Sequence, residues 1–288
     1  MQQKRVSLVL GSGGARGLAH VGIIKWLEEH DYKIESISGC SIGALIGGFY
    51  AAGKLDIYVD WIQKLDIFDM LKLLDFKGSG GLISGDTLME KMHSLVGDCL
   101  IEDLSIKFTA VASDIDSEKE IWINKGSLLN AIRASISLPL FFTPYLYQGR
   151  YLVDGGVLNP VPIAPTFNDN TDLTIAVNLG GSPASDGALK NIKKELDFSE
   201  KIKKHINKIT IPESVVNETG MYNIANKSFD SMQGAIARMK LSAYPPDIEL
   251  EIPRNLCGMF DFNKANEIIE YGYNFCEKIF AEIENNKS

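Results

Sequence analysis

A serine in the pattern Gly-x-Ser-x-Gly, at residues 39–43, places the strongest constraint on how this chain folds. An apolar run precedes the pattern and a stretch of small residues, 44–53, follows it, so the sequence predicts a strand, a tight turn and a helix. Such a turn projects the serine hydroxyl from the end of a sheet, with the helix N-terminus behind it. Gly39 and Gly43 fit this interpretation because a Cβ at either position would collide with neighbouring backbone. We therefore take Ser41 as the candidate nucleophile; an ordinary glycine-rich turn is the alternative.

The composition indicates a folded protein and argues against several classes of function. Of the 288 residues, 45% are hydrophobic and 23% are charged, enough to bury a sizeable core, and we expect one domain over residues 1–288. The net charge of −8 argues against nucleic-acid binding, which needs a basic surface. The four cysteines and four histidines lack metal-ligand spacing, so we expect no metal, no cofactor and no disulfide framework.

The sequence predicts no segment that spans a membrane, since none approaches the ~20 consecutive apolar residues that this requires. The apolar run Val6–Leu10 is also too short for the core of a signal peptide. We expect a cytoplasmic protein; peripheral attachment to a membrane and the oligomeric state stay open. A lysine-rich stretch within 182–208 would suit anionic lipid headgroups but is more typical of a solvated surface.

A second glycine-rich loop, residues 11–17, follows the first predicted strand and precedes a helix. Its spacing is not that of a dinucleotide-binding fingerprint, because Arg16 stands where the third glycine belongs and the next strand ends without an acidic residue. Glycine N–H groups at a helix N-terminus instead converge on one point and carry the positive end of the helix dipole. Beside a nucleophilic serine, that point is where an oxyanion forms, so Gly13 and Gly14 are candidate donors; a plain tight turn is the alternative.

The aspartate of Asp154-Gly155-Gly156 is the candidate general base. Residues 145–147 and 150–153 predict a hairpin that ends at this aspartate. A carboxylate at a strand end, followed by two glycines, can reach into a cleft with backbone close on both sides. The alternative is a turn aspartate that accepts hydrogen bonds from local N–H groups.

A histidine base fits the sequence poorly. The triad of an α/β-hydrolase needs the chain order Ser, acid, His, and only His205, in the lysine-rich stretch, follows Asp154. We therefore expect Asp154 to contact Ser41 directly. Because a carboxylate is a weak base toward an alcohol, donors to the oxyanion must lower much of the barrier, at about 3 kcal/mol each.

Four blocks of this sequence together resemble the patatin-like phospholipase family, the serine–aspartate lipid acyl hydrolases. In the family's order they are Gly13–Gly17, Gly39–Gly43, Ala134–Pro139 with Phe142 and Pro144, and Asp154–Gly156. The resemblance covers residues 5–180 and implies a three-layer α/β/α fold with a mainly parallel central sheet. Residues 182–288 carry no matching motif; we interpret them as the rest of the same domain, with 182–245 a candidate lid or surface segment.

The resemblance also implies roles for single residues. Ser41 would accept the acyl group and Asp154 would act as the base. The oxyanion hole would consist of Gly13, Gly14, Ala15 and Arg16, and Gly155 and Gly156 would support the base. Ser12 departs from the family, in which many members carry a further glycine, so the number of donors stays open.

The function that the resemblance implies is hydrolysis of a lipid or lysophospholipid ester, as in a phospholipase A or lysophospholipase, through an acyl-enzyme and without a cofactor. Two alternatives stay open. One is a non-catalytic lipid-binding or regulatory protein with the same fold, although such a protein needs no serine, aspartate and glycine loop together. The other is a soluble short-chain esterase or thioesterase.

Overall fold

The computed structural model describes residues 3–66, 69, 73, 83–185 and 221–286. Within them, the strands are β1 (Lys4–Leu10), β2 (Tyr32–Cys40), β3 (Lys107–Asp114), β4 (Lys119–Ile123), β5 (Tyr145–Tyr147), β6 (Arg150–Asp154), β7 (Leu173–Gly181) and β8 (Ile248–Pro253). The α-helices are α1 (Ala19–Glu29), α2 (Ile42–Ala51), α3 (Leu55–Ile62), α5 (Asp86–Val96), α6 (Leu128–Ser135), α10 (Met221–Ala243) and α11 (Ala265–Asn285). Short 3₁₀ helices are η1 (Gly14–Leu18), η3 (Ile101–Asp103), η4 (Gly155–Val157), η5 (Ala164–Thr166) and η6 (Phe262–Lys264).

The described strands form one mixed, mostly parallel sheet in the order β5-β6-β3-β2-β1-β7-β8, with β4 also paired to β3. The five strands from β3 to β8 in this order run parallel. Antiparallel pairings join β4 and β6 to β3, and β5 to β6. The α/β fold with a mainly parallel sheet, predicted from the sequence, is confirmed.

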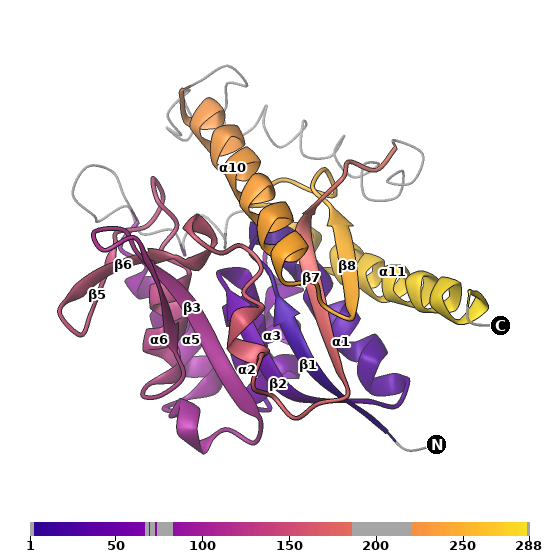
Figure 1. Ribbon diagram of the computed structural model, residues 1–288. Coiled ribbons are helices and arrows are strands. Elements are labelled where there is room, and N and C mark those ends of the chain that lie inside the picture. Colours follow the sequence, from indigo (N-terminus) through magenta and orange to yellow (C-terminus); the bar gives the residue numbers. More distant parts are fainter. Residues whose placement is uncertain (1–2, 67–68, 70–72, 74–82, 186–220, 287–288) are drawn as a thin grey trace.

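Alternating side chains of β1 bury two different faces of the sheet. Leu8 and Leu10 belong to the main core, which α1, α2, α6 and α11 also form. Val9 points to the opposite face and packs in a smaller cluster with Ala237 and Leu241 of α10. Figure 1 shows α10 crossing the sheet near β7, and its contact with this cluster completes three layers.

Most elements predicted from the sequence lie where expected. The hairpin β5–β6 turns at Gln148 and Gly149, whose φ angles of 48° and 79° are those that such a turn needs. α5 has Gly85 as its N-cap residue, with a left-handed φ of 79°. All the lysines of the lysine-rich stretch lie outside the described residues.

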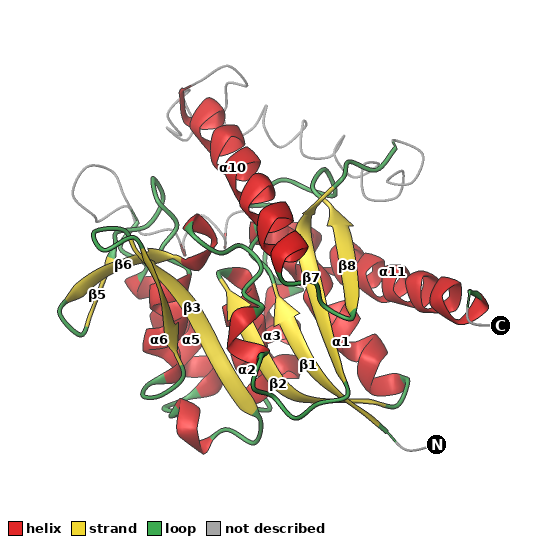
Figure 2. Ribbon diagram, viewed as in Figure 1, coloured by secondary structure: helices red, strands yellow, loops and turns green. Residues whose placement is uncertain are grey.

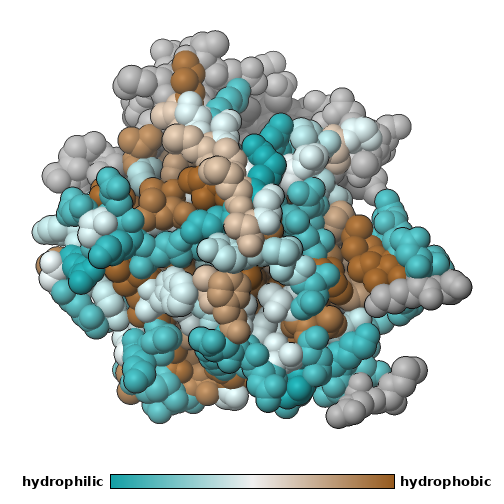
Figure 3. All heavy atoms as spheres, in the orientation of Figure 1, coloured by the Kyte–Doolittle hydropathy of each residue, from teal (hydrophilic) through white to brown (hydrophobic). Residues whose placement is uncertain are grey.

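No helix in the described part of the chain is long and apolar enough to cross a membrane. The face of the molecule drawn in Figure 3 carries apolar side chains among polar ones. The exposed apolar residues on α10 include Ile224, Met232 and Met239.

Candidate active site

Strand register brings Ser41 and Asp154 to the same end of the sheet. Cys40 pairs with Val111 on β3, so Ser41 follows at the level of Ala112. On the same edge of β3, just beyond the end of β2, Ala112 pairs with Asp154, the last residue of β6, while β4 takes the opposite edge. The two residues therefore lie next to each other along one edge of β3, and their segments are in contact, since a Cβ on Gly155 would lie 2.9 Å from Cys40 Cβ.

Ser41 occupies a strained turn between β2 and α2. Its φ of 55° and ψ of −128° lie in a region that residues with a side chain rarely adopt. The Ser41 N–H donates to Ser135 Oγ at 2.9 Å, and Ser135 Oγ donates onward to the Val111 carbonyl at 2.6 Å. The surrounding structure thus fixes the strained turn and leaves the Ser41 side chain partly exposed.

The two glycines that flank Ser41 allow the turn to pack against its neighbours. A Cβ on Gly39 would lie 2.5 Å from the Gly43 carbonyl oxygen. A Cβ on Gly43 would lie 2.1 Å from the Leu10 carbonyl oxygen, on β1. The steric reason inferred from the sequence for these glycines therefore has identified contacts.

Asp154 is fully buried, and its two carboxyl oxygens have different surroundings. Oδ1 accepts from the Gly156 N–H at 2.7 Å. Burial raises the pKa of Asp154 to about 7, although the Ser41 hydroxyl and the Gly156 N–H both act to lower it. The hydroxyl is thus near the carboxyl, yet Oδ2 lacks a well-formed hydrogen bond from any described residue. Oδ2 is the oxygen left to accept a proton, and such contacts often tighten only when substrate binds.

The glycines after Asp154 permit very close packing of the backbone. A Cβ on Gly155 would lie 2.0 Å from the Val111 carbonyl oxygen. A Cβ on Gly156 would lie 2.2 Å from Gln233 Nε2, on α10. Neither position can carry a side chain without movement of its neighbours, which agrees with the supporting role predicted for both.

At least three N–H groups of the glycine loop are already used by the protein, and the first, that of Gly11, donates to the Val177 carbonyl at 3.0 Å. The Ser12 N–H donates to the Pro160 carbonyl at 2.9 Å, and the Ala15 N–H donates to the Met259 carbonyl at 2.8 Å. Neither is free to bind an oxyanion in this conformation. The doubt about Ser12 that the sequence raised therefore has a structural answer.

The Gly13 and Gly14 N–H groups, in contrast, donate to no atom of the described residues. Arg16 Nε donates to the Gly13 carbonyl at 3.0 Å. Because C=O and N–H point in opposite directions across a trans peptide, this bond turns the Gly14 N–H away from Arg16. The guanidinium is itself held by the Arg254 carbonyl at 2.9 Å and by Asp230 at 3.1 Å. Its contacts are those of a residue that orients the loop.

Residues 159–162 also contribute to the site, and the sequence does not predict this. The Pro160 carbonyl accepts from Cys40 Sγ at 3.3 Å as well as from Ser12, and the Pro162 carbonyl accepts from Ser38 Oγ at 2.7 Å. This segment thus joins the glycine loop to the strand that carries Ser41. The two prolines were the available signal, because they fix the backbone whose carbonyls accept these bonds.

The described histidines take no part in this arrangement. His20 is buried with Nε2 3.0 Å from the Gly11 carbonyl, and burial lowers its pKa to about 4. His30 contacts the Trp26 carbonyl, and His93 contacts the exposed Asp98. His205 lies outside the described residues. Within the residues that are described, no group of three or more His, Cys, Asp or Glu side chains could hold a metal ion.

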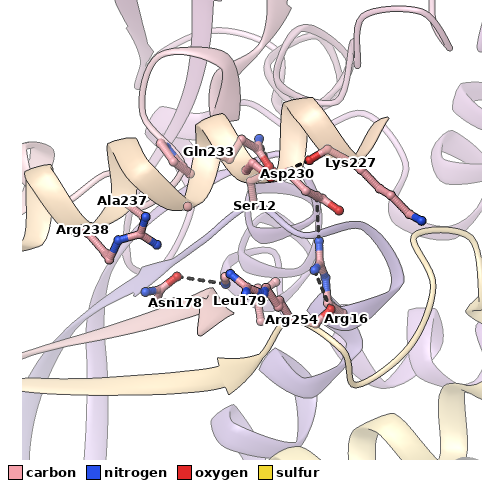
Figure 4. A pocket seen from close by; sticks show the side chains of 14 residues that line it. Ser12, Arg16, Asn178, Leu179, Lys227, Asp230, Gln233, Ala237, Arg238 and Arg254 are labelled. Atoms are coloured by element: carbon pink, nitrogen blue, oxygen red, sulfur yellow. Dashed lines mark hydrogen bonds and ion pairs between the residues drawn. The ribbon is translucent and has the colours of Figure 1, made fainter. Parts of the chain in front are cut away.

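A cavity of about 520 Å³ lies between α10 and the glycine loop. Figure 4 shows side chains of α10 on one side, and the end of β7 with Arg16 and Arg254 on the other. Ser12 lines this cavity, but Ser41 and Asp154 do not. It therefore adjoins the candidate active site rather than containing it.

The fold, the serine turn and the glycine loop are those of one family: the model of the patatin-like phospholipases matches residues 8–167, and the chain belongs to that family. Among its relatives is the uncharacterized NTE family protein Rv1063c of Mycobacterium tuberculosis. It is 33% identical over 320 residues, covering 93% of this chain and 89% of the relative.

Other relatives are much longer than this chain. Lysophospholipase nte1 of Neurospora crassa is 28% identical and neuropathy target esterase sws of Drosophila melanogaster is 29% identical. The matches cover 97% and 96% of this chain but only 18% and 20% of those proteins. The crystal structure of VipD from Legionella pneumophila has the same fold, with a TM-score of 0.59 at 14% identity, over 98% of this chain and 67% of that one.

Proposed function

We propose that this protein is a lysophospholipase-type acyl hydrolase in which Ser41 is the nucleophile and Asp154 the base. One observation carries the proposal. A buried carboxyl oxygen, Asp154 Oδ2, has no well-formed hydrogen bond from a described residue, and its carboxyl group lies near the hydroxyl of a serine held in a strained turn. Buried polar atoms are seldom left without a partner, and the exceptions are concentrated where chemistry occurs.

The reaction follows from these atoms in two steps. Ser41 Oγ attacks the ester carbonyl carbon while its proton passes to Asp154 Oδ2, and the carbonyl oxygen becomes an oxyanion. The free N–H groups of Gly13 and Gly14 are positioned by their loop to stabilise that charge. Collapse breaks the bond to the alcohol, which leaves with the proton from Asp154. Water then attacks the acyl-enzyme, gives a proton to Asp154, and releases the fatty acid and the Ser41 hydroxyl.

The pKa of Asp154 suits this role. A carboxylate with a pKa near 4 is too weak a base to take a proton from an alcohol efficiently, and burial raises this one to about 7. The base is thereby stronger but still substantially ionised at neutral pH. A base with this pKa can act on serine without a histidine between them.

Lipid-like substrates are supported by the surroundings of the site and by the names of the relatives. Leu140 and Phe260 are exposed apolar residues, and Phe260 packs against Phe141 at 4.7 Å between ring centroids. Both segments reach the site, since the Ser137 carbonyl accepts from the Asp154 N–H and the Met259 carbonyl accepts from the glycine loop. These side chains offer an apolar surface to an acyl chain. The relative nte1 is named a lysophospholipase.

The experiment is a panel of acyl esters analysed by mass spectrometry, with the Ser41→Ala variant as the blank. The panel contains lysophospholipid, diacyl phospholipid, monoacylglycerol, a short-chain ester and a thioester. We expect fatty acid release to be fastest from lysophospholipid and absent with Ser41→Ala. Equal release by the variant would contradict the proposal. Lipid binding without turnover would favour a non-catalytic protein, and preference for monomeric over micellar ester would favour a soluble esterase.

A further inference from the structure

We propose that the cavity between α10 and the glycine loop binds the phosphate of the lysophospholipid substrate. This inference rests on the proposed function and specifies which part of the substrate the cavity recognises. The first observation is the charge of the cavity walls. Its lining includes four cationic residues, Arg16, Lys227, Arg238 and Arg254, but only one carboxylate, Asp230. Such a surplus of positive charge is notable on a chain whose net charge is −8.

Not all of these cations are free to bind a ligand. Arg16 is 5% exposed and is already paired with Asp230. Arg238 lies near Glu251: burial and Glu249 raise the pKa of Glu251, while Arg238 opposes them. Even if Asp230, Glu249 and Glu251 are all counted as ionised, the four cations exceed them by one.

Lys227 and Arg254 form no ion pair with any residue in the described part of the chain. Figure 4 shows the side chains of Arg238 and Lys227 on α10, with Arg254 on the opposite side of the cavity. An anion between them would contact positive charge from two sides. Arginine suits this position because its planar fork can donate two hydrogen bonds to one phosphate.

Neutral polar side chains form the rest of the wall nearest the site. Gln233 and Asn178 are 7% and 3% exposed, so the cavity is lined by fixed groups as well as by surface charges. Gln233 Nε2 donates to Ser12 Oγ at 3.3 Å, and the Asn178 side chain is held by Glu249 and by the Gly180 N–H. Hydroxyl and amide groups of this kind add hydrogen bonds to phosphate oxygens.

The cavity adjoins the reacting atoms without containing them, as a binding site for the headgroup would. Ser12 lines it, and the next residue, Gly13, carries one of the two free N–H groups. Gly156, which donates to Asp154, packs so closely on Ser12 that a Cβ would lie 2.7 Å from its hydroxyl. Ser41 is absent from the lining, so the ester would lie beside the cavity and not inside it. In a lysophospholipid the glycerol unit would join the phosphate in the cavity to the ester beside it.

The test compares two substrates that share an acyl chain and differ in phosphate, a lysophosphatidic acid and the corresponding monoacylglycerol, both below micellar concentration. The variant is Arg238→Gln combined with Arg254→Gln. The control is Lys25→Gln combined with Lys278→Gln, which removes two exposed charges from α1 and α11, where those side chains are 65% and 73% exposed. The measured quantity is the ratio of kcat/KM for the lysophospholipid to that for the monoacylglycerol.

We expect this ratio to fall about tenfold or more in the double arginine variant, mainly through KM, because hydrogen bonds to charged groups are lost. Restoring charge with Arg238→Lys and Arg254→Lys should recover part of the loss. The control with Lys25→Gln and Lys278→Gln should leave the ratio unchanged. An unchanged ratio in the arginine variant would overturn the proposal, as would an equal fall in the control.

A binding measurement separates this inference from the proposed hydrolysis. In the Ser41→Ala protein, calorimetry with the same lysophosphatidic acid should show binding that the arginine double variant weakens about tenfold. If the wild type hydrolyses other esters but the Ser41→Ala protein does not bind the lysophosphatidic acid, or binds it equally well without the two arginines, the inference alone is overturned. Arginine-dependent binding in a protein that hydrolyses no ester would overturn the proposed function alone. If inorganic phosphate binds to the wild type as tightly as the lipid, the site is for free anions, and the headgroup assignment falls.

Discussion

The Gly156 N–H donates to Asp154 Oδ1 at 2.7 Å, and the second carboxyl oxygen is left buried without a well-formed hydrogen bond from the described residues. The carboxylate thus receives one strong bond where full satisfaction would take several. Burial outweighs that bond and the influence of Ser41, so the pKa of Asp154 rises to about 7. This balance gives the proposed base a measurable titration.

Activity should therefore follow the ionisation of Asp154. Because only the carboxylate can accept the Ser41 proton, kcat/KM for a monoacylglycerol should rise with pH up to about 7 and then level off. Initial rates between pH 5 and 9, with an uncharged substrate, measure this directly. A rate that is constant from pH 5 to 8 would exclude a base with this pKa.

Replacement of Asp154 by Asn should abolish hydrolysis but stabilise the fold at high pH. The folded-state pKa is about 7, above the ordinary aspartate pKa of 3.8, so the folded protein loses stability as pH rises from about 4 to 7. Asparagine does not titrate, and it can still accept from Gly156. The free energy of unfolding of Asp154→Asn minus that of the wild type should increase by about 2–3 kcal/mol between pH 5 and pH 8.

Urea unfolding at the two pH values measures that difference. The Asp169→Asn variant is a control, because Asp169 is a carboxylate near the opposite end of the parallel strands with a lysine partner, Lys107. A difference for Asp154→Asn that does not change with pH would contradict the burial argument.

Ser135 should be a positioning residue for the nucleophile. Ser135→Ala removes the acceptor of the Ser41 N–H and the donor to Val111, so we expect a loss of about 1–3 kcal/mol in stability and a lower kcat. Ser38→Ala is the matched control, since it removes a buried bond of 2.7 Å to the Pro162 carbonyl without touching Ser41. At similar losses of stability, kcat should fall at least tenfold more in Ser135→Ala. Equal kcat values would assign Ser135 to stability alone.

Substitution of Gly14 in the glycine loop should lower kcat, whereas substitution of Gly53, another glycine with a positive φ, should not. Gly14 has φ of 58°, and a Cβ there would lie 2.6 Å from the Met259 carbonyl oxygen, whereas Gly53 has φ of 64° and nothing within 4 Å. Gly53→Ala should cost about 1 kcal/mol of stability and leave kcat unchanged. Gly14→Ala should also displace a donor and lower kcat about a hundredfold. Steady-state kinetics with thermal unfolding tests both, and equal kcat in the two variants would contradict the oxyanion role.

Much of the fold could be read from the sequence because its signals are local. The apolar run of β1, the glycine loop and α1 appear in order, and the turn residues of the β5–β6 hairpin specify its geometry. The family resemblance was confirmed as well. What the sequence could not show were contacts between distant segments, such as Ser41 with Ser135 or Ser12 with Pro160, because no short-range pattern encodes them.

The cavity, too, could not be predicted from the sequence, because its walls come from distant segments. Arg238 lies on α10 and Arg254 follows β8, and they come near the glycine loop through the packing of α10 across the sheet and the pairing of β8 with β7. In the sequence they are single charges on an acidic chain. The sequence singled out a different set of cations, those of the lysine-rich stretch, and none of them is among the described residues.

The most direct test of the account is intact-protein mass spectrometry after reaction with a fluorophosphonate, followed by peptide mapping. We predict one adduct per chain, on Ser41, formed much more slowly in Asp154→Asn and absent in Ser41→Ala. Labelling of another residue while Ser41 is untouched would contradict the account, and so would labelling of Asp154→Asn at the wild-type rate.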